Sequence, residues 1–431
     1  MGQRRHFLFL QGPHGPFFRQ LAQALRTCGA TCERVGLNPS DRIFWGPEHY
    51  TAFEGTSAHW EAWLQDHMTR SQATDIVLYG DARPCHARAL HLAAKLGITP
   101  HIFEEGYVRP YWVTYERGGT NGNSCVSSIP YAAMARALGN LRNGSQDIPA
   151  SWGDMREHIF WGAAYHGFLL LPRISYPHYR GHRDIGVRRE FGLYLRKLLL
   201  IAPHAADRWL ATYQIKTGHF PYHLALLQLA HDPNFRGHGP FETHRHFLKK
   251  VIDGFAAGAP RHHHLVFKAH PLEDGRTPLR RDILDLASRS GVANRVHFLR
   301  GGKLARLLDD AESAVTVNST AAHQALLRGL PVKAFGASVY ARPGLTSDQS
   351  IDAFFADPVR PDLEVYAVLR TFLMATSQVS GGFYSAAGRR RLLRQITDLI
   401  LSPADRYETL LGGTNAAYPQ HLAPLKSASA D

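Results

Sequence analysis

Short apolar runs that alternate with amphipathic segments are the feature that most constrains the fold of this chain. In the first half, the apolar runs read as buried strands and lie at residues 5–11, 31–37, 75–79 and 100–103. The amphipathic segments between them read as helices and lie at residues 17–27, 59–69 and 86–96. Strands that alternate with helices predict a parallel sheet covered by helices.

The same alternation restarts in the second half, after an apolar run at 223–229. Further strands are predicted at residues 264–268, 295–299, 313–317 and 331–335. Helices are predicted at residues 245–255, 279–288, 303–309 and 321–328. Residues 125–220 are less regular and read as helical and connecting. The pattern is typical of two doubly wound halves with a cleft between them.

The length supports two domains, because 431 residues exceed one ordinary hydrophobic core. We therefore predict an α/β fold with two Rossmann-like domains that face a cleft. The predicted first domain, residues 1–215, holds the acceptor side and a helical connecting region. The second, residues 216–400, binds the nucleotide-sugar, and residues 401–431 form a tail.

The net charge of +13 favours anionic partners. No basic–aromatic ladder of the RNA-binding kind is present, so a nucleic-acid partner is not expected. The basic cluster Arg389–Arg391 opens a helix-like stretch. It is either a solvated helix face or a site of attraction to anionic lipid.

We expect the chain to remain in the cytoplasm. It has no apolar run of about 18 residues, as a membrane-spanning helix would need. The apolar run Phe7–Leu10 is shorter than a signal-peptide core of about 7–15 residues.

No metal site is predicted. The run Arg261–His264 begins a strand, so its neighbouring histidines point to opposite faces. DxD-type, HExxH and Walker motifs are absent, and Gly12–Pro16 lacks the dinucleotide-binding spacing. The four cysteines form no CxxC pair and are expected to be free thiols.

A pair of carboxylates follows the strand predicted at 100–103. Gly106 after Glu104 and Glu105 permits a sharp turn, and Arg109 is close enough in sequence to balance their charge. Neighbouring acids in a cleft push their pKa values apart, which suits acid–base catalysis. A solvated acidic turn is the alternative, and the sequence does not show which glutamate would act.

Three polar side chains follow apolar runs in the second half. Asp232 precedes a proline, where it could equally cap a turn. Lys268 and His270 share one strand face by the two-residue period, and a cation beside an imidazole suits a phosphate leaving group. An exposed histidine without function is the alternative, in a chain with 26 of them.

A turn of small polar residues, Asn318-Ser319-Thr320, lies between a predicted strand and a helix. Ser319 or Thr320 can cap that helix. The free N–H groups at the start of a helix also suit a phosphate. Capping does not exclude phosphate binding, so both interpretations stand.

The order of these groups resembles the motif series of bacterial CMP-sugar transferases, including sialyltransferases. It is more similar to the capsule polysaccharide biosynthesis family, and there to β-Kdo transferases of the KpsS type; Kdo is an eight-carbon keto-sugar acid. The stretches that carry this resemblance are LQGPHGPFFRQLAQAL, FEEGYVRPYWVTYE with GGTNGNS, LLQLAHDPNFRGHGPF, KAHPLEDG, RVHFL, VNSTAAHQALLRGLPVKAFG and YARPGLT.

The resemblance implies a GT-B-like fold, a CMP-β-Kdo donor and retention of the anomeric configuration. It also implies a lyso-phosphatidylglycerol or glycolipid acceptor at the inner membrane, where the chain would be peripheral. Other capsule synthesis and export proteins would be its partners. No cofactor or metal is implied.

The same resemblance implies roles for individual residues. Asp232 would attack the anomeric carbon, and Glu104 or Glu105 would be the partner acid or base. His270 would be catalytic and also bind the donor. The CMP-binding residues would be Lys268, His270, Pro271, Asn318, Ser319 and Thr320. The residues that position acceptor or sugar would be Gln228, Arg109, Asn121, Gly12 and Pro13.

Two alternatives stay open at this point. One is a related transferase that uses CMP-sialic acid or a UDP-sugar. The other is a non-catalytic capsule assembly or export protein, in which the carboxylates and His270 are structural.

Overall fold

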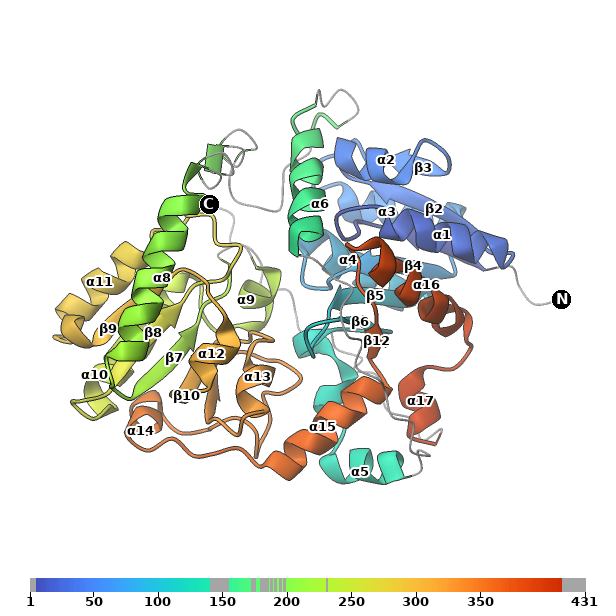
Figure 1. Cartoon of the computed structure of the whole chain (residues 1–431). Helices are drawn as coiled ribbons and strands as arrows, with labels where there is room; N and C mark the ends of the chain where they lie inside the picture. Colours follow the sequence, from blue (N-terminus) through green and yellow to red (C-terminus); the bar gives the residue numbers. More distant parts are fainter. Residues whose placement is uncertain are drawn as a thin grey trace. The chain divides into compact units, whose positions relative to one another are not determined.

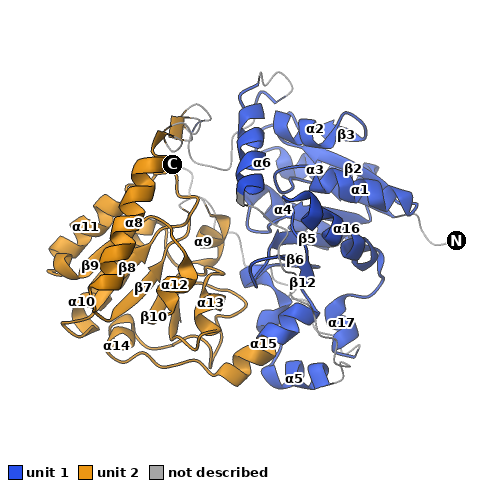
Figure 2. Cartoon of the chain, in the orientation of Figure 1, with its two compact units in different colours: residues 1–187, 370–431 blue, residues 188–369 orange. Residues whose placement is uncertain are grey.

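The computed structural model describes residues 5–139, 155–171, 176–178, 199–229 and 232–412, with isolated positions between 186 and 196. The chain forms two compact units (Figures 1 and 2). Unit 1 comprises residues 1–187 and 370–431, and unit 2 comprises residues 188–369.

Unit 1 is built on a seven-stranded sheet in the order β12-β6-β5-β4-β1-β2-β3. Its strands are β1 (His6–Phe9), β2 (Thr31–Gly36), β3 (Tyr50–Ala52), β4 (Asp75–Tyr79), β5 (Thr99–Glu105), β6 (Trp112–Glu116) and β12 (Gln378–Ser380). The first five are parallel. β6 is antiparallel to β5, and β12 is antiparallel to β6.

Helices cover both faces of this sheet, which is why its strands read as continuous apolar runs. The helices are α1 (Phe17–Thr27), α2 (Pro39–Trp45), α3 (Trp60–Arg70), α4 (Pro84–Leu96), α5 (Tyr131–Gly139), α6 (Met155–Phe168), α16 (Ala386–Leu401) and α17 (Arg406–Leu410), with 3-10 turns at Asn121–Asn123 and Cys125–Ser128. Phe7 of β1 packs in one core with Leu21 of α1 and Ile396 of α16. Leu8 packs in the other core with Leu64 of α3.

The C-terminal segment returns to unit 1, which corrects the predicted domains 1–215, 216–400 and 401–431. β12 pairs with β6, and α16 packs against α1. Arg117 donates hydrogen bonds to the carbonyls of Leu399 (2.9 Å) and Ser402 (2.7 Å) at the end of α16. The second unit therefore ends at residue 369, within α15 (Leu363–Ala375).

Unit 2 has a five-stranded parallel sheet in the order β11-β10-β7-β8-β9. Its strands are β7 (Tyr222–Leu226), β8 (His264–Lys268), β9 (Val296–Leu299), β10 (Ala311–Thr316) and β11 (Val332–Ala334). Its helices are α8 (Ile201–Thr217), α9 (Pro233–His238), α10 (His244–Gly258), α11 (Leu279–Arg289), α12 (Leu304–Leu308), α13 (Ala322–Leu326) and α14 (Ile351–Ala356), with a 3-10 turn at Ala293–Arg295. Phe267 of β8 packs in the core with Leu248 of α10, Ile283 of α11 and Phe354 of α14.

Both units have the strand order of a doubly wound Rossmann-like sheet, in which the chain starts at the centre and winds first one way and then the other. The prediction of two Rossmann-like α/β halves is confirmed. The order reverses between β1 and β4 in unit 1, and between β7 and β10 in unit 2. Ligands of such sheets bind beyond the carboxyl ends of the strands at this reversal. Within the part of the chain that the structure describes, no helix is both long and apolar enough to cross a membrane.

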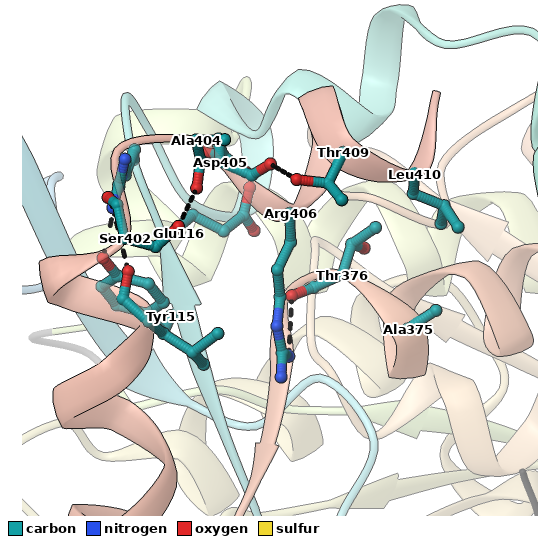
Figure 3. Close-up of a pocket in the computed structure, with 12 residues that line it drawn as sticks. Tyr115, Glu116, Ala375, Thr376, Ser402, Ala404, Asp405, Arg406, Thr409 and Leu410 are labelled. Carbon is teal, nitrogen blue, oxygen red and sulfur yellow. Dashed lines mark hydrogen bonds between the residues drawn. The ribbon is translucent and has the colours of Figure 1, made fainter. Parts of the chain in front are cut away.

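A pocket of about 430 Å³ lies in unit 1 beside Glu116, at the end of β6 (Figure 3). Its other lining residues are Tyr115, Arg117, Ala375, Thr376, Leu399, Ser402, Ala404, Asp405, Arg406, Thr409 and Leu410. Several of its polar groups hold the C-terminal segment in place. Asp405 caps α17, and Arg406 donates to the carbonyl of Thr376 at 3.2 Å. We therefore interpret this pocket as part of the join between the C-terminal segment and the sheet.

Glu116 is buried, with 2% of its surface exposed. Its carboxyl group accepts hydrogen bonds from the hydroxyls of Tyr107 (2.8 Å) and Ser124 (2.6 Å). Burial raises its pKa to about 8, so this side chain is protonated at neutral pH.

Glu116→Gln is expected to change how stability depends on pH. The folded protein holds the Glu116 proton up to a pKa of about 8, whereas the unfolded chain releases it near 4.5. The folded state binds more protons between these values, so the free energy of unfolding falls as pH rises, by up to about 1.4 kcal/mol per pH unit from this group. Denaturant unfolding between pH 5 and 8, conditions chosen to span this window, should show a flatter slope in Glu116→Gln. The exposed control Glu54→Gln should keep the wild-type slope. A wild-type slope in Glu116→Gln would contradict the assignment.

Candidate functional site

The predicted polar residues of the second half lie along one edge of the unit 2 sheet. β7, β8 and β10 are parallel neighbours, so their carboxyl ends share this edge. Gln228 follows β7, Lys268 ends β8, and Asn318 follows β10. The edge includes the reversal point between β7 and β10, where ligands of such sheets bind.

Gln228 and Asn318 form a reciprocal pair across this reversal point. The Gln228 amide donates to Asn318 Oδ1 at 2.8 Å, and the Asn318 backbone N–H donates to Gln228 Oε1 at 3.2 Å. Asn318 Nδ2 donates to the carbonyl of Asn234 at 2.8 Å. Both side chains are only 6% exposed. The pair fixes the two loops against each other and against the start of α9.

Asp232 is attached to the same pair. Its Oδ2 accepts from Gln228 Nε2 at 3.3 Å, and its Oδ1 accepts from the backbone N–H of Asn234 at 2.9 Å. The second bond caps α9, so the capping role expected as the alternative is present. The side chain is half-buried. These bonds orient the Asp232 carboxylate at the sheet edge, and they are compatible with a chemical role.

Lys268 is a buried cation, with 6% of its surface exposed. Its ammonium makes no hydrogen bond or ion pair with the residues that the structure describes. Burial lowers its pKa to about 8. A buried charge without a partner is costly, and an anion that entered this edge would offset the cost. Lys268 therefore suits a phosphate ligand.

His270 follows β8 by two residues and is half-buried. Its Nδ1 accepts from the backbone N–H of Leu272 at 3.1 Å, so the neutral ring carries its proton on Nε2. Pro271 between them is exposed. The strand ends at Lys268, so the two-residue period used in the prediction does not extend to His270.

The Asn318–Thr320 turn differs from the prediction. The residue at the start of α13 is Ala321, and no side chain caps the helix. Ser319 Oγ instead accepts from the Ala321 backbone N–H at 3.2 Å within the turn. The expectation that Ser319 or Thr320 caps this helix is wrong. Because α13 has only 5 residues, it also offers little dipole to a phosphate.

Unit 1 holds a second polar group, at the end of β5. Glu105 accepts hydrogen bonds from the hydroxyls of Tyr79 (3.2 Å) and Tyr384 (3.0 Å). His158 of α6 stacks on Tyr384 with ring centroids 4.0 Å apart. The sequence analysis did not identify Tyr79, Tyr384 or His158, and no local motif marks them. Both Glu104 and Glu105 are half-buried.

Gly12 and Pro13 follow β1, at the reversal point of the unit 1 sheet, and are buried. A Cβ on Gly12 would lie 2.5 Å from the ring of Phe18. Only glycine fits there, which gives this position a packing reason.

Asn121 and Arg109 are held in loops of unit 1. The Asn121 backbone N–H donates to the hydroxyl of Tyr107 at 2.6 Å, with φ at 51°. Arg109 is exposed, and its Nε donates to the carbonyl of Gly106 at 3.1 Å. The structure thus assigns both residues a loop contact, and their predicted roles toward the acceptor stay predictions.

Among the described residues, no group of three or more His, Cys, Asp or Glu side chains could hold a metal ion. Two members of the histidine run have different partners. His263 lies 3.0 Å from His223, and His264 lies 2.8 Å from His297.

The sheets and their polar edges define a two-unit α/β protein of the Rossmann type. The family model described as capsule polysaccharide biosynthesis protein matches residues 74–384, and the chain belongs to this family. The chain is 29% identical over 385 residues to the capsule polysaccharide export protein KpsS of Escherichia coli, covering 88% of this chain and 97% of KpsS. It is also 29% identical over 391 residues to the capsule polysaccharide modification protein LipB of Neisseria meningitidis, covering 88% of this chain and 92% of LipB.

Solved structures that are similar include two modules of KpsC from Thermosulfurimonas dismutans. Its β-Kdo 2,7 transferase matches with a TM-score of 0.43 and 10% identity, over 92% of this chain and 100% of that one. Its β-Kdo 2,4 transferase matches with a TM-score of 0.36 and 13% identity, over 86% of this chain and 91% of that one. TM-scores this low carry no argument, so the fold assignment rests on the sheets themselves.

Lys268→Met is expected to stabilise the protein. At pH 7 the ammonium is charged in both the folded and the unfolded state, and the drop of its pKa from 10.5 to about 8 corresponds to a cost of about 3 kcal/mol. The free energy of unfolding of Lys268→Met at pH 7 should therefore exceed that of the wild type by up to about this amount.

The unfolded chain binds the Lys268 proton more tightly, so wild-type stability rises from pH 8 towards 10.5 and the advantage of Lys268→Met shrinks there. The exposed control Lys250→Met should leave stability unchanged. Denaturant unfolding measures all three proteins. A Lys268→Met protein less stable than the wild type at pH 7 would contradict this interpretation.

Proposed function

We propose that this chain is a retaining glycosyltransferase that moves Kdo from CMP-β-Kdo onto a lyso-phosphatidylglycerol or glycolipid primer in capsular polysaccharide biosynthesis. Membership of the capsule polysaccharide biosynthesis family supports the pathway. The ordered motifs support the donor and the acceptor. The observation that carries the proposal is the buried Lys268 ammonium at the carboxyl edge of a Rossmann-like sheet, which favours an anionic, phosphate-bearing ligand.

The proposed CMP site uses the residues at this edge. Lys268 would neutralise the phosphate, and His270 would donate from Nε2 to a phosphate oxygen. Pro271 and the Asn318–Thr320 turn would line the same site. The Gln228–Asn318 pair would hold this edge rigid, so that little reorganisation accompanies binding.

The proposed reaction has two displacements at the anomeric carbon. The Asp232 carboxylate attacks this carbon, the bond to the phosphate oxygen breaks, and CMP leaves with the bonding electrons. The acceptor hydroxyl then attacks the same carbon, loses its proton to a base, and releases Asp232. Two inversions give net retention. Glu104 or Glu105 is the proposed base, on the family resemblance alone.

Two further functions have support. A related transferase with CMP-sialic acid or a UDP-sugar would use the same sheet edge. A non-catalytic capsule export or assembly role matches the printed name of the KpsS relative. Donor screening by thermal shift separates these cases, because a ligand at about 100 times its dissociation constant adds about 2.7 kcal/mol of stability.

Asp232→Asn is expected to abolish transfer while CMP still binds. The purified chain is incubated with CMP-β-Kdo and a lyso-phosphatidylglycerol primer, and mass spectrometry measures the glycosylated lipid. Turnover should fall by at least about 100-fold, because the nucleophile is lost. The exposed control Asp348→Asn, also in unit 2, should match the wild type.

The outcomes separate the three functions. Wild-type turnover in Asp232→Asn would remove it as the nucleophile. A stability response to UDP and none to CMP would favour the other donor. A response to neither, with no product, would favour the export or assembly role.

A further inference from the structure

Helix α8 exposes large apolar side chains on one face. Trp209, Leu210 and Tyr213 are 68%, 50% and 55% exposed, and Ile201 is 59% exposed. Ile215 lies on the opposite side of the helix and is buried. A surface helix ordinarily turns polar side chains to water. A contiguous exposed apolar face therefore indicates an interaction surface.

The two aromatic residues of this face form a stacked pair. Trp209 and Tyr213 are one helical turn apart, with ring centroids 5.7 Å apart and ring planes 15° from parallel. Each side chain combines an apolar ring with a polar N–H or O–H group. Trp and Tyr are enriched where a membrane meets water for this reason.

Basic side chains border the aromatic pair. Asp207, the acidic residue of α8, lies 3.5 Å from Arg280 and 3.3 Å from Arg300. Arg208 follows it and is exposed. Three arginines beside one aspartate leave a local surplus of two positive charges, on a chain with a net charge of +13. Each basic residue near an anionic bilayer contributes about 1 kcal/mol of attraction, so the border complements such a surface.

The helix is suited to lie on a bilayer rather than to cross it. It has 17 residues, and none of the described helices meets the length and apolarity that spanning requires. An apolar face with a basic border is the pattern of helices that lie in the plane of the membrane surface. Figure 2 shows α8 in front of β8 and β9, and it contacts β9 of the unit 2 sheet.

We infer that α8 is the surface through which this chain binds an anionic phospholipid bilayer, with Trp209 and Tyr213 inserted at the head-group boundary and Arg208, Arg280 and Arg300 over the phosphates. The inference rests on the proposed function only in that its acceptor is a membrane lipid. The aromatic pair with its basic border favours lipid over a protein partner.

Vesicle binding tests the surface directly. The full chain is mixed with vesicles of phosphatidylglycerol and phosphatidylcholine, and co-sedimentation measures partitioning. The double variant Trp209→Gln with Tyr213→Gln should partition at least about tenfold more weakly, because two aromatic side chains no longer leave water. The matched control, Leu327→Gln with Val359→Gln, changes two exposed apolar residues elsewhere in unit 2 and should bind like the wild type. Thermal unfolding midpoints verify that both variants are folded.

A second measurement reports insertion rather than binding. Brominated phosphatidylglycerol quenches the fluorescence of tryptophans that enter the bilayer. Part of the wild-type emission should be quenched, and this part should be missing in Trp209→Phe. The quenched part would persist in Trp209→Phe if another tryptophan made the contact, and this result would overturn the assignment.

The assays contain neither donor nor primer, so their result does not depend on transfer activity. Failure of the transferase proposal leaves the vesicle result standing, and the reverse also holds. Wild-type partitioning by the double variant would overturn the inference. Loss of self-association in that variant on ultracentrifugation, with vesicle binding unchanged, would make this face a contact between copies of the chain and would also overturn it.

Discussion

The reciprocal hydrogen bonds between Gln228 and Asn318 hold together the edge on which the functional interpretation depends. They bridge the point where the strand order of unit 2 reverses, and neither side chain is exposed by more than 6%. Asp232 is oriented by the same glutamine. Without this pair, the loops after β7 and β10 would have no fixed relation, and a carboxylate could not be aimed at a bound sugar.

Beside this rigid edge lies a charge that folding alone does not explain. The Lys268 ammonium is buried among apolar strands, and its depressed pKa measures the cost of leaving water. Proteins accept such costs at binding sites, where a ligand supplies the missing partner. The edge therefore combines a fixed amide pair, an oriented carboxylate and a cation with capacity for an anion.

Local pattern predicted the strands 75–79 and 264–268 with the bounds found in the structure, because each is an apolar run between polar turns. β12 was missed because three residues carry no period, and its partner β6 lies more than 260 positions earlier. Tyr384 was missed as a partner of Glu105 for the same reason, since 279 positions separate them. Sequence pattern identifies residues that end strands, whereas long-range pairing decides what each of them contacts.

A crystal structure of the chain with CMP tests the central claim most directly. The account predicts the CMP phosphate within hydrogen-bonding distance of Lys268 Nζ, at the edge formed by the loops after β7, β8 and β10. A nucleotide bound elsewhere, with the Lys268 ammonium still buried and without an anionic partner, would contradict it.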